Sequence, residues 1–248
     1  MMSIFSSTEQ LNLIRKILSR YIRLPFSSVT IPGAIMEGVL AHVRGGHVLN
    51  TYDFVDVIVS NEKIGWQVKS TKASTPVTWK RAKLPNASDL IEYSRKSTLG
   101  LQNLGNAIIE FCNEHAQQSI KKYDLDEIGY SRLVIKPGGK VSYFEKLLCT
   151  RDNPCIFNAG DFEWIWSTPK TSTKKEQLQS LHGIHKPTNK KWWAWHGLGE
   201  NQLHFSGENA WWPSNNYSHM TAFSFPSDDE KLSLDNFLEM LSNYDITA

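Results

Sequence analysis

The stretch from Thr51 to Thr71, TYDFVDVIVSNEKIGWQVKST, predicts a β-hairpin around which the rest of the chain is arranged. Apolar residues alternate along both of its halves, as in strands with one buried face: Val55, Val57 and Val59, then Ile64, Trp66 and Val68. The polar run from 60 to 63 separates the two halves as a turn. With the turn centred on Asn61 and Glu62, Val57 faces Trp66 and Asp56 faces Gln67.

The other face of this hairpin carries three polar side chains: Asp56, Gln67 and Lys69. A carboxylate and an amide oxygen are hard ligands of the kind that Mg²⁺ prefers, and phosphate oxygens with waters could complete its coordination. A lysine beside them could orient a water or stabilise charge on a phosphate. The combination indicates metal-dependent hydrolysis of phosphodiesters. The alternative is an exposed cross-strand pair between Asp56 and Lys69 without any chemistry.

This arrangement resembles the PD-(D/E)xK nuclease motif, in which an acid at the start of one strand is followed by acid-x-Lys on the next. The matching positions are Asp56 for the first acid, Gln67 for the second and Lys69 for the lysine. The chain departs from the motif twice, because no proline precedes Asp56 and a glutamine replaces the second acid. The resemblance implies DNA as substrate and Mg²⁺ as cofactor, held by Asp56 and Gln67. Asp53 is a rival for the first acid if a bulge shifts the strand.

A helix is predicted just before the hairpin, in the run IPGAIMEGVLAHVRGG from Ile31 to Gly46. Pro32 lies near its first turn, and Gly45 and Gly46 follow its last. Glu37 is the single acid in this run. The resemblance implies that Glu37 reaches the active site, and the alternative is an ordinary exposed acid.

Length and composition predict an ordinary globular protein. The chain has 248 residues, 40% of them apolar and 21% charged, which suits one sizeable domain or a domain with an added lobe. The net charge of +2 means that affinity for nucleic acid would come from local clusters of basic residues. Three cysteines without paired spacing and no apolar run of membrane-spanning length predict a reduced, cytoplasmic protein outside the membrane.

The first 148 residues are predicted to form the nuclease core. A capping box at Ser7 begins a first helix, a long helix runs from 98 to 123, and a second hairpin spans 130–135 and 140–148. The order of helices and strands predicts an α/β fold, with a central mixed sheet flanked by helices. We expect the apolar face of the first hairpin to pack on the long helix, with Cys112 in the core.

The segment from Lys72 to Pro85 is predicted to be a basic loop that contacts DNA phosphates. It contains no acid, and its candidate contact residues are Lys72, Trp79, Lys80, Arg81 and Lys83. The position of this segment directly after Lys69 favours that role over a merely solvated loop.

Residues 149–248 are predicted to form a Trp-rich C-terminal part with β-strands, either a separate recognition lobe or a continuation of one domain. Strands are expected at 162–166, 191–195 and 202–205, and helices at 174–185 and 233–244, the last docked on the body. Lys190 and Lys191 are candidate DNA-contact residues, and Asn189, Asn201 and Gln202 could read base edges. The tryptophans at 192, 193, 195, 211 and 212 could stack on bases, although core positions are the more usual role.

These observations favour a Mg²⁺-dependent, sequence-specific endonuclease of double-stranded DNA, similar to type II restriction enzymes. We expect a homodimer, so that two active sites meet the two strands of a symmetric site. Three alternatives stay open: a repair or junction-resolving nuclease, a non-catalytic DNA-binding module on the same fold, and an α/β protein with no role in nucleic-acid binding.

Overall fold

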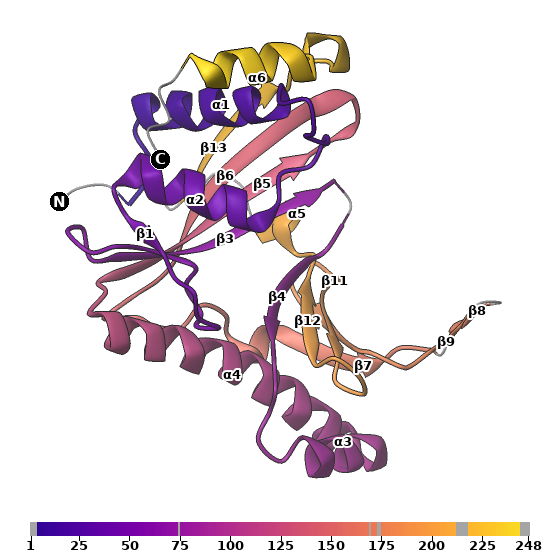
Figure 1. The fold of residues 1–248 in the computed structure, drawn as a ribbon. Helices are drawn as coiled ribbons and strands as arrows, with labels where there is room; N and C mark the ends of the chain where they lie inside the picture. Colours follow the sequence, from indigo (N-terminus) through magenta and orange to yellow (C-terminus); the bar gives the residue numbers. More distant parts are fainter. Residues whose placement is uncertain (1–3, 74, 169, 173–174, 212–217, 244–248) are drawn as a thin grey trace.

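The computed structural model describes residues 4–73, 75–168, 170–172, 175–211 and 218–243 (Figure 1). The helices are α1 (Thr8–Ile22), α2 (Gly33–Arg44), α3 (Ala87–Lys96), α4 (Thr98–Tyr123), α5 (Glu208–Trp211) and α6 (Leu234–Ser242). The strands of the first half are β1 (His47–Val48), β2 (Val57–Val59), β3 (Ile64–Lys72), β4 (Val77–Arg81), β5 (Glu127–Ile135) and β6 (Lys140–Thr150). Those of the second half are β7 (Phe162–Trp166), β8 (Lys170–Ser172), β9 (Lys175–Gln177), β10 (Leu181–His185), β11 (Lys190–His196), β12 (Gln202–Phe205) and β13 (Ser218–Ser224).

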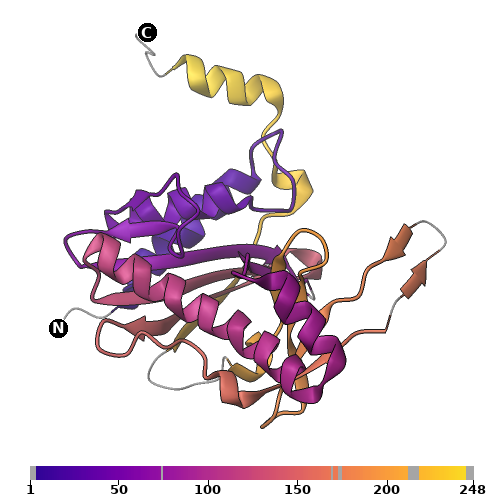
Figure 2. The ribbon, with the colours of Figure 1, turned by 90° about the horizontal axis from the view of Figure 1, so that it is seen from below.

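The central sheet has six strands in the order β1-β2-β3-β5-β6-β13. Strands β3 and β5 run parallel and are joined by α3 and α4, whereas the other neighbours in this sheet are antiparallel. Helices α1 and α2 cover one face and α4 lies on the other (Figure 2). The predicted α/β fold with a mixed, helix-flanked sheet is therefore confirmed. The first hairpin has the predicted register, with Val57 opposite Trp66.

The apolar face of that hairpin packs on α1 and α2, so our expectation that it packs on the long helix is wrong. Val57, Trp66 and Val68 are buried in one core with residues of α1 and α2 such as Leu18 and Met36. The opposite face is also covered, because Ile58 belongs to a second core that includes α4. A sheet with helices on both faces buries both faces of its central strands. The alternation of apolar residues in the sequence identified only one of these two buried faces.

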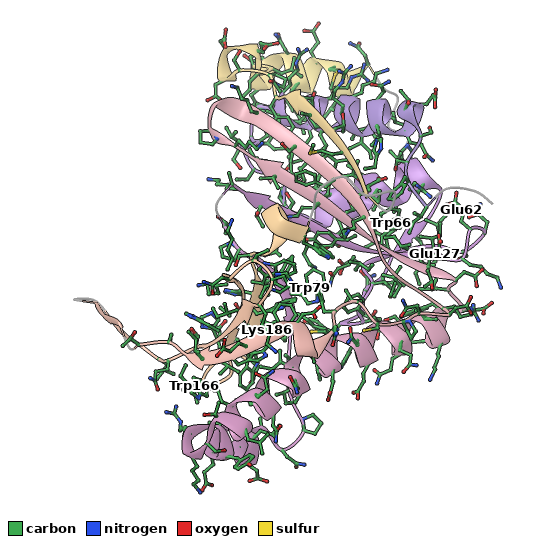
Figure 3. All side chains as sticks on the ribbon, turned by 180° about the vertical axis from the view of Figure 1, so that it is seen from behind. Glu62, Trp66, Trp79, Glu127, Trp166 and Lys186 are labelled. Atoms are coloured by element: carbon green, nitrogen blue, oxygen red, sulfur yellow. The ribbon has the colours of Figure 1, made fainter. Side chains whose placement is uncertain are left out.

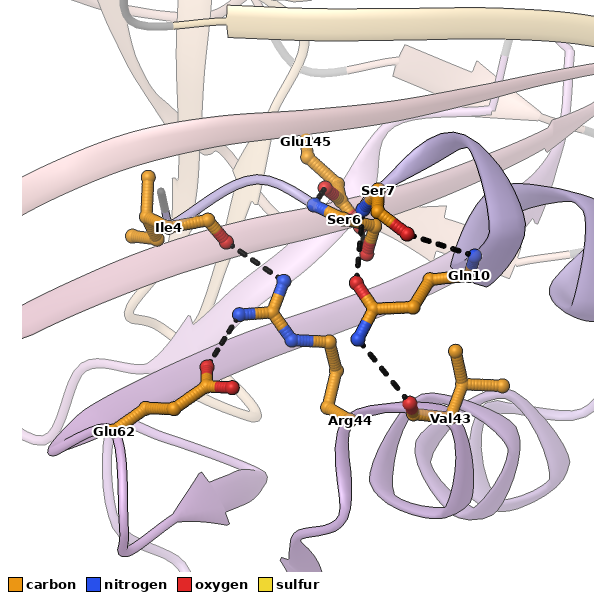
Figure 4. A network of polar contacts seen from close by, with 8 residues as sticks. All are labelled: Ile4, Ser6, Ser7, Gln10, Val43, Arg44, Glu62 and Glu145. Atoms are coloured by element: carbon orange, nitrogen blue, oxygen red, sulfur yellow. Dashed lines mark hydrogen bonds and ion pairs between the residues drawn. The ribbon is translucent and has the colours of Figure 1, made fainter. Parts of the chain in front are cut away.

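Buried polar contacts fix the N-terminal segment and α2 against the sheet (Figure 4). The Arg44 guanidinium donates to the Ile4 carbonyl oxygen at 2.9 Å and to Glu62 at 2.6 Å. The buried carboxylate of Glu145 accepts from the backbone N–H of Ser6 at 2.7 Å and from its hydroxyl at 2.6 Å. Because buried charges are stable only when paired or hydrogen-bonded, these contacts define the position of α2 relative to the hairpin turn.

The second sheet is antiparallel, in the order β4-β12-β11-β10-β7. Its inner face and α4 enclose an aromatic core that contains Trp79, Trp193 and Phe205 (Figure 3). Trp192, Trp193 and Trp195 are buried there, as expected of core residues, and Trp211 is partly buried against the same core, while position 212 lies outside the described residues. Strand β4 joins this sheet although it precedes residue 148, and β13 joins the central sheet although it follows residue 149.

One prediction for the C-terminal part is wrong, and a second holds only in part. Residues 175–177 and 181–185 form strands β9 and β10 where the sequence predicted a helix over 174–185, of which position 174 lies outside the described residues. Pairing of β10 with both β7 and β11 supplies hydrogen bonds that override the local helical pattern. The terminal helix α6 is docked only in part, because Leu234 and Leu238 are 57% and 52% exposed, whereas Phe237 and Leu241 are partly buried. Among the described residues, the structure has no helix that is both long and apolar enough to cross a membrane.

Candidate active site

The candidate site lies at the beginning of the short strand β2, where the antiparallel strand β3 continues beyond it. Asp56 comes just before β2, and its carboxylate Oδ2 accepts the backbone N–H of Val68 at 2.7 Å. The same oxygen is 3.4 Å from the ammonium nitrogen of Lys69. The Asp56 carboxylate therefore replaces the backbone acceptor that a longer β2 would have offered to the Val68 N–H. The side chains of Asp56 and Lys69 remain partly exposed at this open edge.

Glu37 belongs to the same group of charges. It lies in α2, is partly buried, and its pKa is raised first by burial and then by the negative charge of Asp56, while Lys69 opposes the shift. Two neighbouring carboxylates with one lysine form a small acidic cluster, in which a cation would relieve the repulsion between the acids. Asp56 and Lys69 are in contact, and Glu37 is close enough to feel the charges of both.

Gln67 is on the same strand face as Lys69, but its amide group turns toward β4. It is 2% exposed, and its amide nitrogen donates to the Trp79 carbonyl oxygen at 3.2 Å. Within the described part of the chain, its amide oxygen is buried without a hydrogen-bond partner. A buried oxygen without a partner costs roughly 1–3 kcal/mol, so this atom is a candidate for a ligand such as a metal ion.

Asp53, the rival first acid, is occupied elsewhere. Its carboxylate accepts hydrogen bonds from Lys122 at 2.8 Å, from the Tyr123 hydroxyl and from Thr51 at 2.8 Å. The hydrogen bonds from Lys122 and Tyr123 lower its pKa to about 2. Asp53 therefore ties the loop before β2 to the end of α4, which favours Asp56 as the acid of the site.

The predicted basic loop contains strand β4, so its residues have different surroundings. Trp79 is 2% exposed in the aromatic core, where it cannot stack on DNA. Lys80 is partly buried, donates to the Tyr52 carbonyl oxygen at 2.9 Å and has a pKa lowered mainly by burial, with Asp53 and Asp56 acting in the opposite direction. Lys72, Arg81 and Lys83 are exposed, as phosphate-contacting residues must be.

Arg132, which was not among the predicted site residues, lies on β5 beside Lys69. It is 1% exposed, and its guanidinium pairs with Glu208 of α5 at 2.6 Å. Glu208 also accepts the Tyr130 hydroxyl at 2.8 Å. An arginine inside the apolar run SRLVI was the available signal, because a buried arginine in a central strand requires an acidic partner.

The candidate contact residues of the C-terminal part lie in or near the second sheet. Lys190 and Lys191 are exposed at the start of β11, and Asn189 adopts a left-handed backbone just before it. Lys191 also lines a pocket of about 320 Å³ on the outer face of the sheet, together with His182, His196 and His204. Ala194 lies between His182 and His204 in the strand register, so its small side chain leaves the space that the histidines border. Asn201 and Gln202 are partly buried.

The donor set fits a hard cation with few protein ligands. One carboxylate from Asp56, the unpartnered oxygen of Gln67 and the nearby Glu37 are all oxygen donors, as Mg²⁺ requires, and water with substrate would supply the rest. No group of three or more His, Cys, Asp or Glu side chains suited to a metal occurs among the described residues.

Comparison with known proteins gives no match, whether to protein-family models, to curated proteins or to solved structures.

Proposed function

We propose that this protein is a Mg²⁺-dependent, sequence-specific endonuclease of double-stranded DNA, of the type II restriction kind. The observation that carries the proposal is the Asp56–Lys69 pair at the open edge of β3, with the unpartnered amide oxygen of Gln67 two residues before the lysine. Metal-dependent hydrolysis of a phosphodiester uses oxygen ligands for a cation and a cationic group beside the attacking water, and these residues are of the types needed.

Each side chain has a role that its position supports. Asp56 and Gln67 would hold the cation, which when bound polarises the scissile phosphate and lowers the pKa of a coordinated water. Lys69, 3.4 Å from Asp56, would donate a hydrogen bond to that water or to the charge that develops on the phosphate. Glu37, whose pKa is raised by burial, would accept a proton close to neutral pH more readily than an exposed glutamate.

DNA binding would depend on exposed basic residues from both sheets. Lys72 follows Lys69 on β3, Arg81 and Lys83 lie at and after the end of β4, and Lys190 and Lys191 begin β11. Strands β4 and β11 flank β12 and run in the same direction, so the surface of this sheet carries Arg81 near one end and Lys190 and Lys191 near the other. Phosphate contacts from such a surface would fix the position of a duplex, and polar groups near it would read the bases.

The experiment is digestion of long double-stranded DNA by the purified protein with Mg²⁺ or with EDTA. A restriction-type enzyme gives discrete fragments with Mg²⁺ and none with EDTA. A smear, or cleavage confined to branched DNA, would favour a repair or junction-resolving nuclease. A gel shift without cleavage would indicate a DNA-binding module, and neither shift nor cleavage would exclude the DNA-directed functions.

Cutting both strands of a symmetric site would require two copies of the chain, which is why we propose a homodimer. We also propose a cytoplasmic location, on the ground that Cys112, Cys149 and Cys155 are free thiols.

A further inference from the structure

Helix α6 is amphipathic, yet none of its residues is buried. Leu234 and Leu238 are more than half exposed, and Met240 is also exposed. Figure 2 shows α6 standing away from the rest of the chain, beyond the segment that follows β13. A helix of nine residues has little stability of its own, so its apolar stripe requires a partner surface.

The base of α6 is fixed to the loop after α1, and this loop is also exposed and apolar. The Leu232 N–H donates to the Arg23 carbonyl oxygen at 2.8 Å, and Lys231 donates to the Ser27 carbonyl oxygen at 3.0 Å. Phe26, which is 69% exposed, meets Phe237 edge-on at a centroid distance of 5.4 Å. We call the exposed apolar side chains of α6 and of the loop after α1 the α6 patch: Phe26, Val29, Leu234, Leu238 and Met240.

Charge indicates what covers the α6 patch. The exposed side of α1 carries three basic residues, Arg15, Lys16 and Arg20, and one acid, Glu9, in its first turn. The segment that contains α6 carries exposed acids: Asp228, Asp229, Asp235 and Glu239. Within one copy, the two segments already make one ion pair, between Arg23 and Glu230 at 2.8 Å. A surface that is acidic on one helix and basic on its neighbour is self-complementary under a two-fold rotation.

We propose that a second copy of this chain covers the α6 patch, with α6 of each protomer lying against α1 of its partner. Two-fold symmetry makes each contact twice, so the apolar stripes of both copies are buried together and both acidic helices meet basic ones. This contact involves none of the residues of the proposed nuclease site. The homodimer forms through this surface, and it does so without DNA.

The first test is sedimentation velocity of the full chain without DNA. The wild-type protein sediments as a dimer at micromolar concentration, and the double variant Leu234→Glu with Leu238→Glu weakens the dimer by roughly 100-fold or more. Ile165→Glu is the matched control, because Ile165 is 45% exposed on β7 of the second sheet, away from the patch, and this variant remains dimeric. Circular dichroism verifies that the variants are folded.

A charge exchange tests which helices meet. Asp235→Lys with Glu239→Lys makes α6 basic, and Lys16→Glu with Arg20→Glu makes α1 acidic. Each double variant alone places like charges against each other and is monomeric, whereas an equal mixture of the two dimerises, because both contacts in the mixed dimer are then complementary. A monomeric wild-type protein would overturn the proposal. Charge variants that dimerise as tightly as the wild type, or a mixture that stays monomeric, would overturn the pairing of α6 with α1.

Discussion

Replacing Gln67 by glutamate tests the metal-site assignment through stability as well as through cleavage. The amide nitrogen of Gln67 donates to the Trp79 carbonyl oxygen at 3.2 Å, inside a side chain that is 2% exposed. Glutamate at this position removes that hydrogen bond and turns a carboxylate toward a carbonyl oxygen. A buried charge without a partner costs roughly 3–5 kcal/mol, so the metal-free variant loses about that much stability at pH 7.

The pH dependence of this loss has a definite sign. Burial beside a carbonyl raises the pKa of the new carboxyl group above its value in the unfolded chain. Such an acid destabilises the folded state at pH values above its folded pKa, and the penalty disappears as pH falls toward the unfolded value, because the protonated acid can again donate to Trp79. The stability deficit of Gln67→Glu should therefore be smaller at pH 5 than at pH 7.

Mg²⁺ should reverse the deficit if Gln67 is a metal ligand. A ligand at 100 times its dissociation constant stabilises the folded state by about 2.7 kcal/mol, and a carboxylate binds the ion more tightly than an amide does. Urea denaturation with and without Mg²⁺ measures the difference. Gln67→Met, of similar size but without oxygen, is the control, and it loses roughly 1–2 kcal/mol at both pH values without a response to Mg²⁺. Gln67 is not a metal ligand if Mg²⁺ stabilises the wild type and Gln67→Glu equally while Gln67→Met still cleaves DNA.

Three further substitutions test the surrounding structure. Val57→Asp should unfold the protein, because it places a charge against α2 in a fully buried position. Thermal denaturation followed by circular dichroism measures the effect, and Tyr52→Asp, at an exposed position, is the control. Asp53→Asn should lower the free energy of unfolding by roughly 1–2 kcal/mol at pH 7, measured in urea, and leave cleavage intact. This loss should vanish as pH falls from 3.8, the ordinary pKa of the carboxyl group, through its folded value of about 2. Glu37→Gln should be more stable than the wild type at neutral pH, because a raised pKa penalises the charged acid, and this difference should disappear below pH 4.5.

The sequence predicted the hairpin and its charged residues because their signals are local. The alternation and the position of the turn predicted the pairing of Val57 with Trp66, and the motif order predicted that Asp56 and Lys69 lie together. The bounds of the long helix, Thr98–Tyr123, were predictable for the same reason, since Ser97 caps it and the chain leaves it at Asp124 in a left-handed conformation.

The contacts that the sequence did not predict are made between distant segments. Strand β4 pairs with β12, about 120 residues later, and that pairing turns the predicted basic loop into a sheet and buries Trp79. Likewise, β10 is a strand because β7 and β11 flank it, whatever its local pattern favours. The alternation of apolar residues also does not determine which helix covers which face of the hairpin, because an apolar face packs equally well on any apolar helix.

The single-turnover rate at which the protein cleaves plasmid DNA with Mg²⁺ tests the roles of Asp56 and Lys69. We expect Mg²⁺-dependent cleavage by the wild type, a loss of roughly 100-fold to 10,000-fold for Asp56→Ala and for Lys69→Ala, and near wild-type rates for Asp53→Asn. DNA binding, measured in parallel, should change little in Lys69→Ala, because one phosphate contact among many is removed. Absence of cleavage by the wild type on DNA that it binds, or an Asp56→Ala variant that cleaves at the wild-type rate, would contradict the assignment of this site.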